Sequence, residues 1–276
     1  MRWTLSDITW SAFDASAVDP ALVEVVKTAS LVEANSPDYV TYLKNVFPGD
    51  TGFHASVEQW GVEEAQHGAA LGKWAELADP SFSFERALAA FKAGYGLDLD
   101  TDQSIRGSRL AELIARSVVE SGTSSFYSAI RDATSEPVLK QVAHRIASDE
   151  FAHYQLFQKY LNTYEGSETL GRLKRLQVAI SRVKEAEDEE LAYAYYAANV
   201  LPAAPETPFD QAACTNAYYM RAFGLYQPQH IDNATRMILR AASFNPNSKG
   251  ADLAVAGFWK LVQFKRGKLE RAMAAA

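Results

Sequence analysis

Two of the five histidines follow a glutamate by three residues, as Glu64-x-x-His67 in EEAQH and Glu150-x-x-His153 in DEFAH. On a helix, positions i and i+3 share a face, so each pair can bind one metal ion. Carboxylate and imidazole ligands together suit Fe or Mn better than a metal that prefers thiolates. The spacing therefore predicts two helices that each present a metal-binding face.

Two more glutamates, Glu33 and Glu120, hold matching positions in the chain. Glu33 lies about 16 residues before the turn PGDTG and Glu64 about 15 after it, and Glu120 and Glu150 flank the turn SEP at about 16 and 14 residues. At 1.5 Å of rise per residue, Glu33 and Glu64 both lie roughly 22 to 25 Å from their turn. The sequence thus repeats one metal-binding helical hairpin.

A single glutamate on a helix is usually solvated, but four that converge inside a bundle would repel one another at high cost. Two metal ions remove that cost. One Glu from each of two helices and Glu-x-x-His from each of two others form the ligand set of di-iron and di-manganese bundles. We therefore expect two Fe ions per chain, with Mn as a substitute, and these ligands: Glu33, Glu64, His67, Glu120, Glu150 and His153. Asp149 and Glu63 are placed to hydrogen-bond the ligand histidines.

The elements that position these residues are all helical, because apolar residues recur at helical spacing without sustained period-two alternation. The sequence predicts a four-helix bundle over residues 20–165. Its expected helices cover residues 20–47, 53–77, 102–133 and 138–164, with a short helix at 84–93 in the connection 79–101.

Residues 166–276 predict accessory C-terminal helices packed on the bundle. A charged helix continues to about residue 200, where the prolines of LPAAPETP end it, and three helices follow near 210–223, 229–242 and 249–273. No low-complexity linker separates the two parts. We therefore expect one domain over residues 1–276.

Composition narrows the classes of protein. The chain of 276 residues has 48% hydrophobic residues and a formal charge of -7, which argues against nucleic acid as a partner. Cys214 is the only cysteine, so disulfide frameworks and CxxC metal sites are excluded. No stretch approaches the roughly 18 to 20 apolar residues that span a bilayer, and MRWTLSDITW does not read as a secretory signal. We expect a cytoplasmic protein with no membrane partner.

Several motifs together resemble one family. They are Glu33-Ala34 with Pro37 and Tyr39, Trp60 before Glu63-Glu64-x-x-His67-Gly68, Glu120 with Thr123 one turn later, and Asp149-Glu150-x-x-His153. Over about residues 22–165 the sequence resembles the soluble acyl-acyl-carrier-protein desaturases of the ferritin-like superfamily. Gln66 and Ala152 depart from it, because the family usually has Arg there. The chain is also shorter than typical members.

The resemblance implies a ferritin-like, di-iron, O2-dependent oxidoreductase that acts on a fatty-acyl or similar apolar substrate. It also implies that Thr123 is a catalytic residue that assists oxygen activation. Because the chain has no flavin or nicotinamide fingerprint, electrons must come from an external donor such as ferredoxin. An acyl carrier protein is a further candidate partner, and we expect a homodimer.

Other functions remain open from the sequence. One is a di-iron oxygenase for another small molecule, and another is a non-catalytic iron-handling or oxidative-stress protein. A stored-radical role is disfavoured, since Leu71 stands where a ribonucleotide reductase small subunit would need Tyr. An acidic carrier protein needs a basic surface, and two clusters are candidates, with solvated helix faces as the alternative: Arg172, Lys174, Arg175, Arg182 and Lys184, and Lys260, Lys265, Arg266, Lys268 and Arg271.

Overall fold

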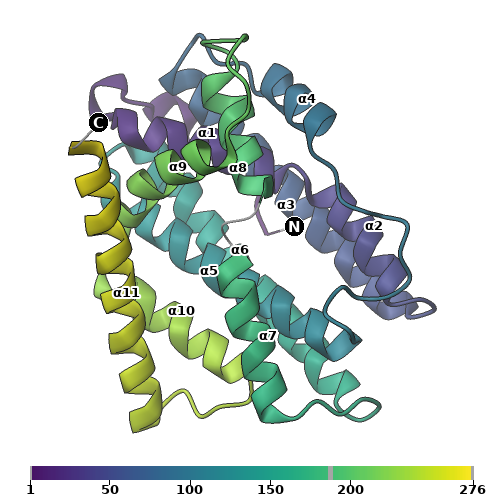
Figure 1. Cartoon of the computed structure of the whole chain (residues 1–276). Coiled ribbons are helices and arrows are strands. Elements are labelled where there is room, and N and C mark those ends of the chain that lie inside the picture. The colour runs from purple at the N-terminus through teal and green to yellow at the C-terminus, as the bar shows by residue number, and fades with distance from the viewer. Residues whose placement is uncertain (1, 186–188, 275–276) are drawn as a thin grey trace.

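The computed structural model describes residues 2–185 and 189–274 (Figure 1). Within these ranges the ordered elements are helices and none is a strand, which confirms the predicted all-α class. In the same ranges, no helix combines the length and the apolar character needed to cross a bilayer.

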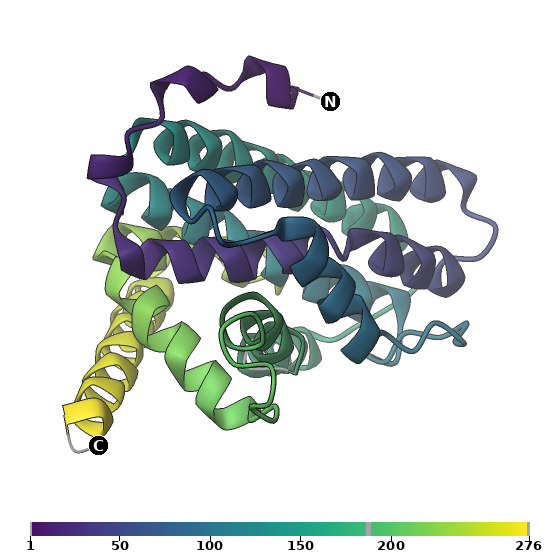
Figure 2. The same ribbon diagram turned by 90° about the horizontal axis from the view of Figure 1, so that it is seen from above.

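The predicted ligands lie on long helices that run side by side (Figure 2). α3 packs against α1, α2 and α6, while α5 and α6 pair along their lengths. The four helices that carry ligands are α1 (Pro20–Glu33), α3 (Thr51–Ala78), α5 (Arg109–Ala133) and α6 (Pro137–Tyr164), and α2 (Ser36–Val46) joins α1 to α3. Because the turns before α3 and α6 are short, each turn joins antiparallel neighbours.

Polar side chains fix where these helices begin. The Asp50 carboxylate accepts a hydrogen bond from the Phe53 amide at 2.9 Å, and the Glu136 carboxylate accepts one from the Leu139 amide at 2.7 Å. Each such cap stabilises a helix start by about 1 kcal/mol. Glu136 also accepts a hydrogen bond from the indole of Trp74 at 2.7 Å, which ties the start of α6 to α3. The caps thereby set the relative levels of the two hairpins.

The single helix predicted over residues 20–47 is wrong in one respect, because it is divided into α1 and α2 immediately after Glu33. Pro37 lies in the first turn of α2, where the missing N–H of proline costs nothing, whereas inside a continuous helix it would break the hydrogen-bond ladder. Asn35 at the break donates to the carboxylate of Glu190 at 2.9 Å, and Tyr39 donates to the same carboxylate at 2.5 Å.

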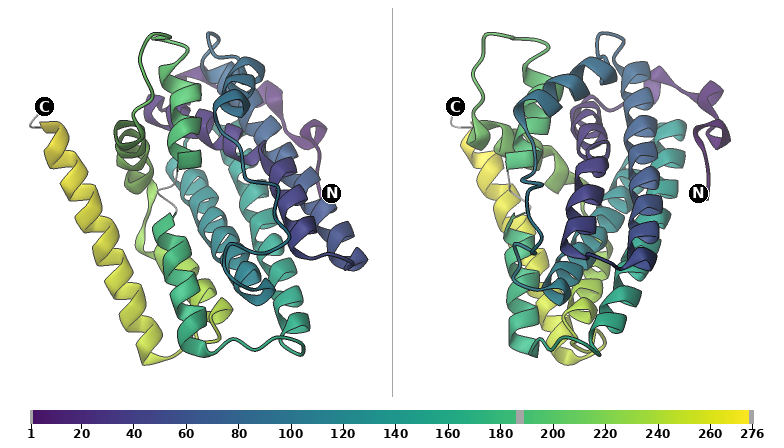
Figure 3. Two further views of the ribbon diagram at one scale, coloured as in Figure 1. Left: turned by 45° about the vertical axis from the view of Figure 1, so that its right-hand side comes forward. Right: turned by 90° about the vertical axis from the view of Figure 1, so that its right-hand side faces the viewer.

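The remaining helices cover the bundle on one side (Figure 3). They are α4 (Phe84–Gly94), α7 (Arg172–Lys184), α8 (Glu189–Tyr195), α9 (Gln211–Leu225), α10 (Pro228–Ala241) and α11 (Lys249–Ala274). α7 and α10 pack on α5, α8 and α9 pack on α1, and α11 packs on α9 and α10. The helix expected up to residue 200 corresponds to α7 and α8 with a following π-helical turn; residues 186–188 of that prediction lie outside the described residues. The helix expected from residue 102 begins instead at Arg109, where the Ser108 side chain caps it.

The first residues form an arm that the sequence did not predict. Three short 3₁₀ turns, at Leu5–Asp7, Trp10–Ala12 and Ala15–Ala17, run along α6. The Thr9 amide donates to Gln141 at 2.9 Å and anchors the arm there. Figure 2 shows this arm on the side of the molecule opposite α11.

Candidate metal centre

Two overlapping groups of buried side chains lie in the interior of the four helices. Glu33, Glu64, His67 and Glu150 form one group, and Glu64, Glu120, Glu150 and His153 form the other; within each group, one ligand atom per residue lies within 4.8 Å of the others. Glu64 and Glu150 belong to both. The structure thus brings all six sequence-predicted ligands together, with two carboxylates placed between two positions that could each hold a metal ion.

The inner nitrogens of both histidines point toward these carboxylates. The Nδ1 atom of His67 lies 3.1 Å from Glu150 and 3.5 Å from Glu64. The Nδ1 atom of His153 lies 2.9 Å from Glu64. The inner nitrogen of each histidine therefore faces the glutamate of the other Glu-x-x-His motif.

The outer nitrogens are held by carboxylates from the facing helix. The Nε2 atom of His67 on α3 lies 3.1 Å from Asp149 on α6, and the Nε2 atom of His153 on α6 lies 2.9 Å from Glu63 on α3. A carboxylate at Nε2 fixes the tautomer that leaves Nδ1 as a lone-pair donor. The residue before each Glu-x-x-His motif thus orients the histidine of the other motif.

Trp3 completes this arrangement from the N-terminal arm. Its indole N–H donates to Asp149 at 2.6 Å, and its ring stacks on His67 with centroids 6.1 Å apart and planes 8° from parallel. The sequence carried no signal for Trp3, because the contact joins residues far apart in the chain through an irregular segment.

Several buried nitrogen and oxygen atoms at this site lack a hydrogen-bond partner, as metal ligands do when no ion is bound. Among the described residues, four such atoms at this site have no hydrogen-bond partner: Nδ1 of His67, Nδ1 of His153, Oε1 of Glu120 and Oε1 of Glu150. Buried polar atoms in folded proteins are nearly always satisfied. These four are all potential metal ligands, and the donor set of oxygens with one imidazole per position fits Fe or Mn.

At this site four buried carboxyl groups surround two imidazoles, and they shift one another's pKa values. Burial and the carboxylate of Glu64 raise the pKa of Glu33, and burial with the carboxylates of Glu150 and Glu64 raises the pKa of Glu120. Burial alone would lower the pKa of His153, but the carboxylates of Glu63 and Glu64 beside its two ring nitrogens outweigh it and raise that pKa to about 10. Burial and like charges thus favour the protonated forms of Glu33 and Glu120, and divalent ions that bind here would displace such protons.

Two hydroxyl groups on α5 contact the candidate ligands. Thr123 donates to Oε2 of Glu150 at 2.5 Å, and Tyr127 donates to Oε1 of Glu33. Glu120, Thr123 and Tyr127 follow one another at i, i+3 and i+7 and so share a helix face. That spacing could have identified Tyr127, which was not among the predicted site residues.

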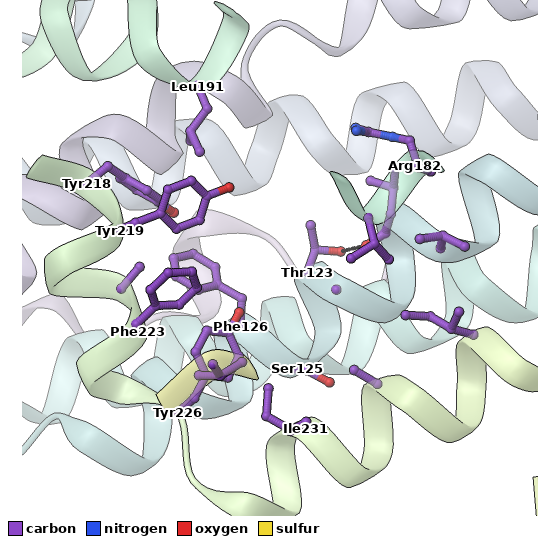
Figure 4. A pocket seen from close by; sticks show the side chains of 18 of the residues that line it. Thr123, Ser125, Phe126, Arg182, Leu191, Tyr218, Tyr219, Phe223, Tyr226 and Ile231 are labelled. Atoms are coloured by element: carbon purple, nitrogen blue, oxygen red, sulfur yellow. Dashed lines mark hydrogen bonds between the residues drawn. The ribbon is translucent and has the colours of Figure 1, made fainter. Parts of the chain in front are cut away.

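A cavity of about 590 Å³ lies against the site (Figure 4). Glu33, Thr123 and Tyr127 belong to its wall, and most of the other lining residues are apolar or aromatic. Figure 4 shows side chains of α9 grouped at one end, among them Tyr218, Tyr219 and Phe223, with Thr123 and Arg182 toward the other. The size falls in the range of small-molecule sites.

Comparison with models of known protein families gives no match. A search of curated protein sequences gives no significant match. The chemistry of the site is therefore what bears on function.

Proposed function

We propose that this protein is a ferritin-like, di-iron, O2-dependent oxidoreductase that acts on a fatty-acyl or similar apolar substrate. One observation carries the proposal: two buried ligand groups that share Glu64 and Glu150 lie against an apolar cavity, and Glu33 and Thr123 belong to both the site and the cavity wall. A substrate in the cavity would lie next to the ligands.

The proposed roles follow from the positions of the side chains. Glu33 with His67, and Glu120 with His153, would each hold one iron ion, while Glu64 and Glu150 would hold both. Bound iron would supply O2 reduction and an oxidant able to remove hydrogen from an unactivated C–H bond. If the substrate loses two hydrogens and O2 becomes two waters, two further electrons and two protons are needed. An external donor such as ferredoxin would provide the electrons.

Two features of this chain would serve that reaction. The hydroxyl of Thr123 lies between the cavity and Oε2 of Glu150, so it can pass a proton between them. The apolar cavity wall would exclude bulk water from the reacting atoms. An iron-handling protein has no need of such a cavity, whereas an oxygenase for another small molecule shares every feature and stays the alternative.

Filling the cavity tests the proposal. A Cβ atom at Gly122, which lines the cavity, would meet no described atom within 4 Å, so Gly122→Leu should block the cavity without moving the backbone, and Gly122→Ala is the matched control. In reduced, iron-loaded wild type, O2 consumption should rise with a fatty-acyl chain, and the product should lose two hydrogens or gain oxygen. Gly122→Leu should keep its iron and lose that coupling. Fe(II) oxidation that neither substrate nor Gly122→Leu changes would favour iron handling.

A further inference from the structure

The cavity opens between α7 and α11. Lys184, on the last turn of α7, and Leu261, in the middle of α11, both line the cavity and are both exposed to solvent. A residue that does both stands at the mouth. Figures 2 and 3 show α7 and α11 on the same side of the molecule, away from the N-terminal arm.

Large apolar side chains are exposed on both sides of this mouth. Leu173 on α7 is 83% exposed, and Leu253 and Phe264 on α11 are 75% and 64% exposed. Ile180 and Leu261 are exposed as well. Spacings of seven residues on α7, and of eight and eleven on α11, place these side chains in one stripe on each helix. Exposed apolar side chains gathered in this way mark an interaction site.

The same two helices are strongly basic, although the chain as a whole carries a charge of -7. α7 contains five basic residues and no acidic residue. α11 contains six basic and two acidic residues, and both acids have a basic partner, Asp252 with Arg236 and Glu270 with Arg266. Lys174 and Lys184 on α7, and Lys260 and Lys268 on α11, are exposed. We call this surface of α7 and α11 the mouth face.

One residue of the first basic cluster does not belong to the mouth face. Arg175 is buried, its guanidinium pairs with Glu165, and it also donates to the Leu170 carbonyl at 2.8 Å. Its role is to hold the start of α7, so it cannot contribute to docking.

We propose that the mouth face binds the surface of an anionic lipid bilayer, from which the cavity takes its apolar substrate. Exposed Leu, Ile and Phe side chains would enter the boundary between headgroups and acyl chains, and each Lys or Arg near an anionic surface adds about 1 kcal/mol of attraction. The exposed apolar and basic side chains support the docking surface by themselves, whereas the use of the mouth for substrate rests on the proposed function. The contact is peripheral, so it does not require a spanning helix, whose absence led us to expect no membrane partner.

Two other occupants fit this face less well. A two-fold contact with a second copy would set the same basic helices against each other, and like charges disfavour that. A soluble acidic carrier protein would match the charge, but it gives no reason for Leu173, Leu253 and Phe264 to be so exposed. A bilayer accounts for the charge, the apolar stripes and the position of the mouth together.

Vesicle co-sedimentation of the full, metal-loaded protein tests the proposal. We expect at least tenfold stronger binding to phosphatidylglycerol-containing vesicles than to pure phosphatidylcholine, and weakening as salt rises. Phe264→Asp and Lys260→Glu/Lys268→Glu should each weaken binding about tenfold. The matched controls are Val62→Asp, at a 49% exposed apolar position on α3, and Lys140→Glu/Lys159→Glu, at exposed positions on α6; both should bind like wild type.

Three results would overturn the proposal: no binding to anionic vesicles at low salt, equal losses in the variants and their controls, or loss of a dimer in Phe264→Asp without vesicle binding. The last result would identify a second copy as the occupant. Iron content and O2 consumption with a short, soluble acyl substrate, measured in parallel, separate the two proposals. If both persist without vesicle binding, only the bilayer contact is wrong; if vesicles bind but iron is absent, the proposed function is wrong.

Discussion

At the level of single side chains, the candidate centre depends on carboxylates that are not themselves ligands. Asp149 and Glu63 each hold the outer nitrogen of a histidine from the opposite helix. This cross-pairing fixes both imidazoles relative to both helices. Trp3 adds a second hydrogen bond to Asp149, so the carboxylate cannot rotate away from His67 without losing both partners.

Replacing Asp149 tests this role. Asp149→Asn should lower iron affinity by about 10- to 100-fold, because a neutral amide is a weaker hydrogen-bond acceptor for His67 than a carboxylate and orients it less firmly. Glu63→Gln should do the same through His153, and Glu58→Gln, an exposed acid on the same helix as Glu63, is the control. Iron affinity would be measured by competition with a chelator. If all three variants bind iron like wild type, the cross-pairing has no function.

A second prediction concerns Thr123. Thr123→Val removes the hydroxyl that donates to Glu150 but keeps the shape of the side chain, so iron content should not change while substrate-coupled O2 consumption falls about tenfold or more. Thr123→Ser should retain most of the rate. Equal rates in wild type and Thr123→Val would remove Thr123 from the proposed mechanism.

The sequence predicted residues whose partners follow from helix periodicity. The six candidate ligands, Asp149 and Glu63 all sit at fixed offsets within a helix or about a turn, and the structure places them together. Trp3 and the α9 side chains of the cavity reach the site through tertiary packing alone. No spacing rule gives such contacts from one sequence.

At the level of elements, the close approach of α1 and α3 sets the position of Glu33 beside His67. Gly68 makes this approach possible, since a Cβ atom there would lie 2.8 Å from both the Ala34 nitrogen and the Ser30 oxygen. Both are backbone atoms, so neither can rotate away. The division between α1 and α2 falls at the same level, where Asn35 and Tyr39 bind Glu190. The sequence showed Pro37 but not this partner, which explains why one helix was predicted.

Gly68→Ala should therefore lower the free energy of unfolding by about 1 to 3 kcal/mol, the usual cost of overpacking. Gly224→Ala is the control, because a Cβ atom on this α9 glycine would meet no described atom within 4 Å; it should be neutral or stabilise the helix by up to about 1 kcal/mol. Denaturant unfolding of both variants measures this. If Gly68→Ala were as stable as wild type, the close approach of α1 and α3 would not depend on Gly68.

An ion pair between the same helices gives a pH dependence. Lys27 on α1 donates to Asp79 at the end of α3 at 2.6 Å, and hydrogen bonds from Lys27 and Ser81 lower the pKa of Asp79 to about 2. The stabilisation is therefore fully present above the ordinary Asp pKa of about 3.9 and is lost as pH falls toward 2.

Asp79→Asn should reduce the free energy of unfolding at pH 7 by at most about 1 kcal/mol, because Asp79 is partly solvated. The difference from wild type should shrink as pH falls from 4 to 2. The control Glu58→Gln breaks an ion pair with Lys44 that is exposed on both sides, and its effect should be smaller. A difference for Asp79→Asn that stays constant with pH would contradict the assignment.

At the level of the whole molecule, two parts of the chain contribute differently to the candidate site and its cavity. The helices up to Tyr164 carry every candidate ligand, and the helices after it provide much of the cavity wall and the mouth face. In the first part the sequence predicted the level at which the ligands meet, because two short turns fix it, but it missed the division between α1 and α2 and the N-terminal arm. It predicted that the second part packs on the first, but not that a cavity lies between them, since a cavity depends on the distances between helices.

The number of iron ions per chain tests the central claim most directly. Elemental analysis of the iron-loaded protein should give about two ions per chain, the stoichiometry of a two-metal site. Glu64→Ala and Glu150→Ala should each lose most of both ions, because each carboxylate belongs to both groups, whereas Glu33→Ala should affect mainly one. Wild type without bound iron, or unchanged iron in both Glu64→Ala and Glu150→Ala, would contradict the account.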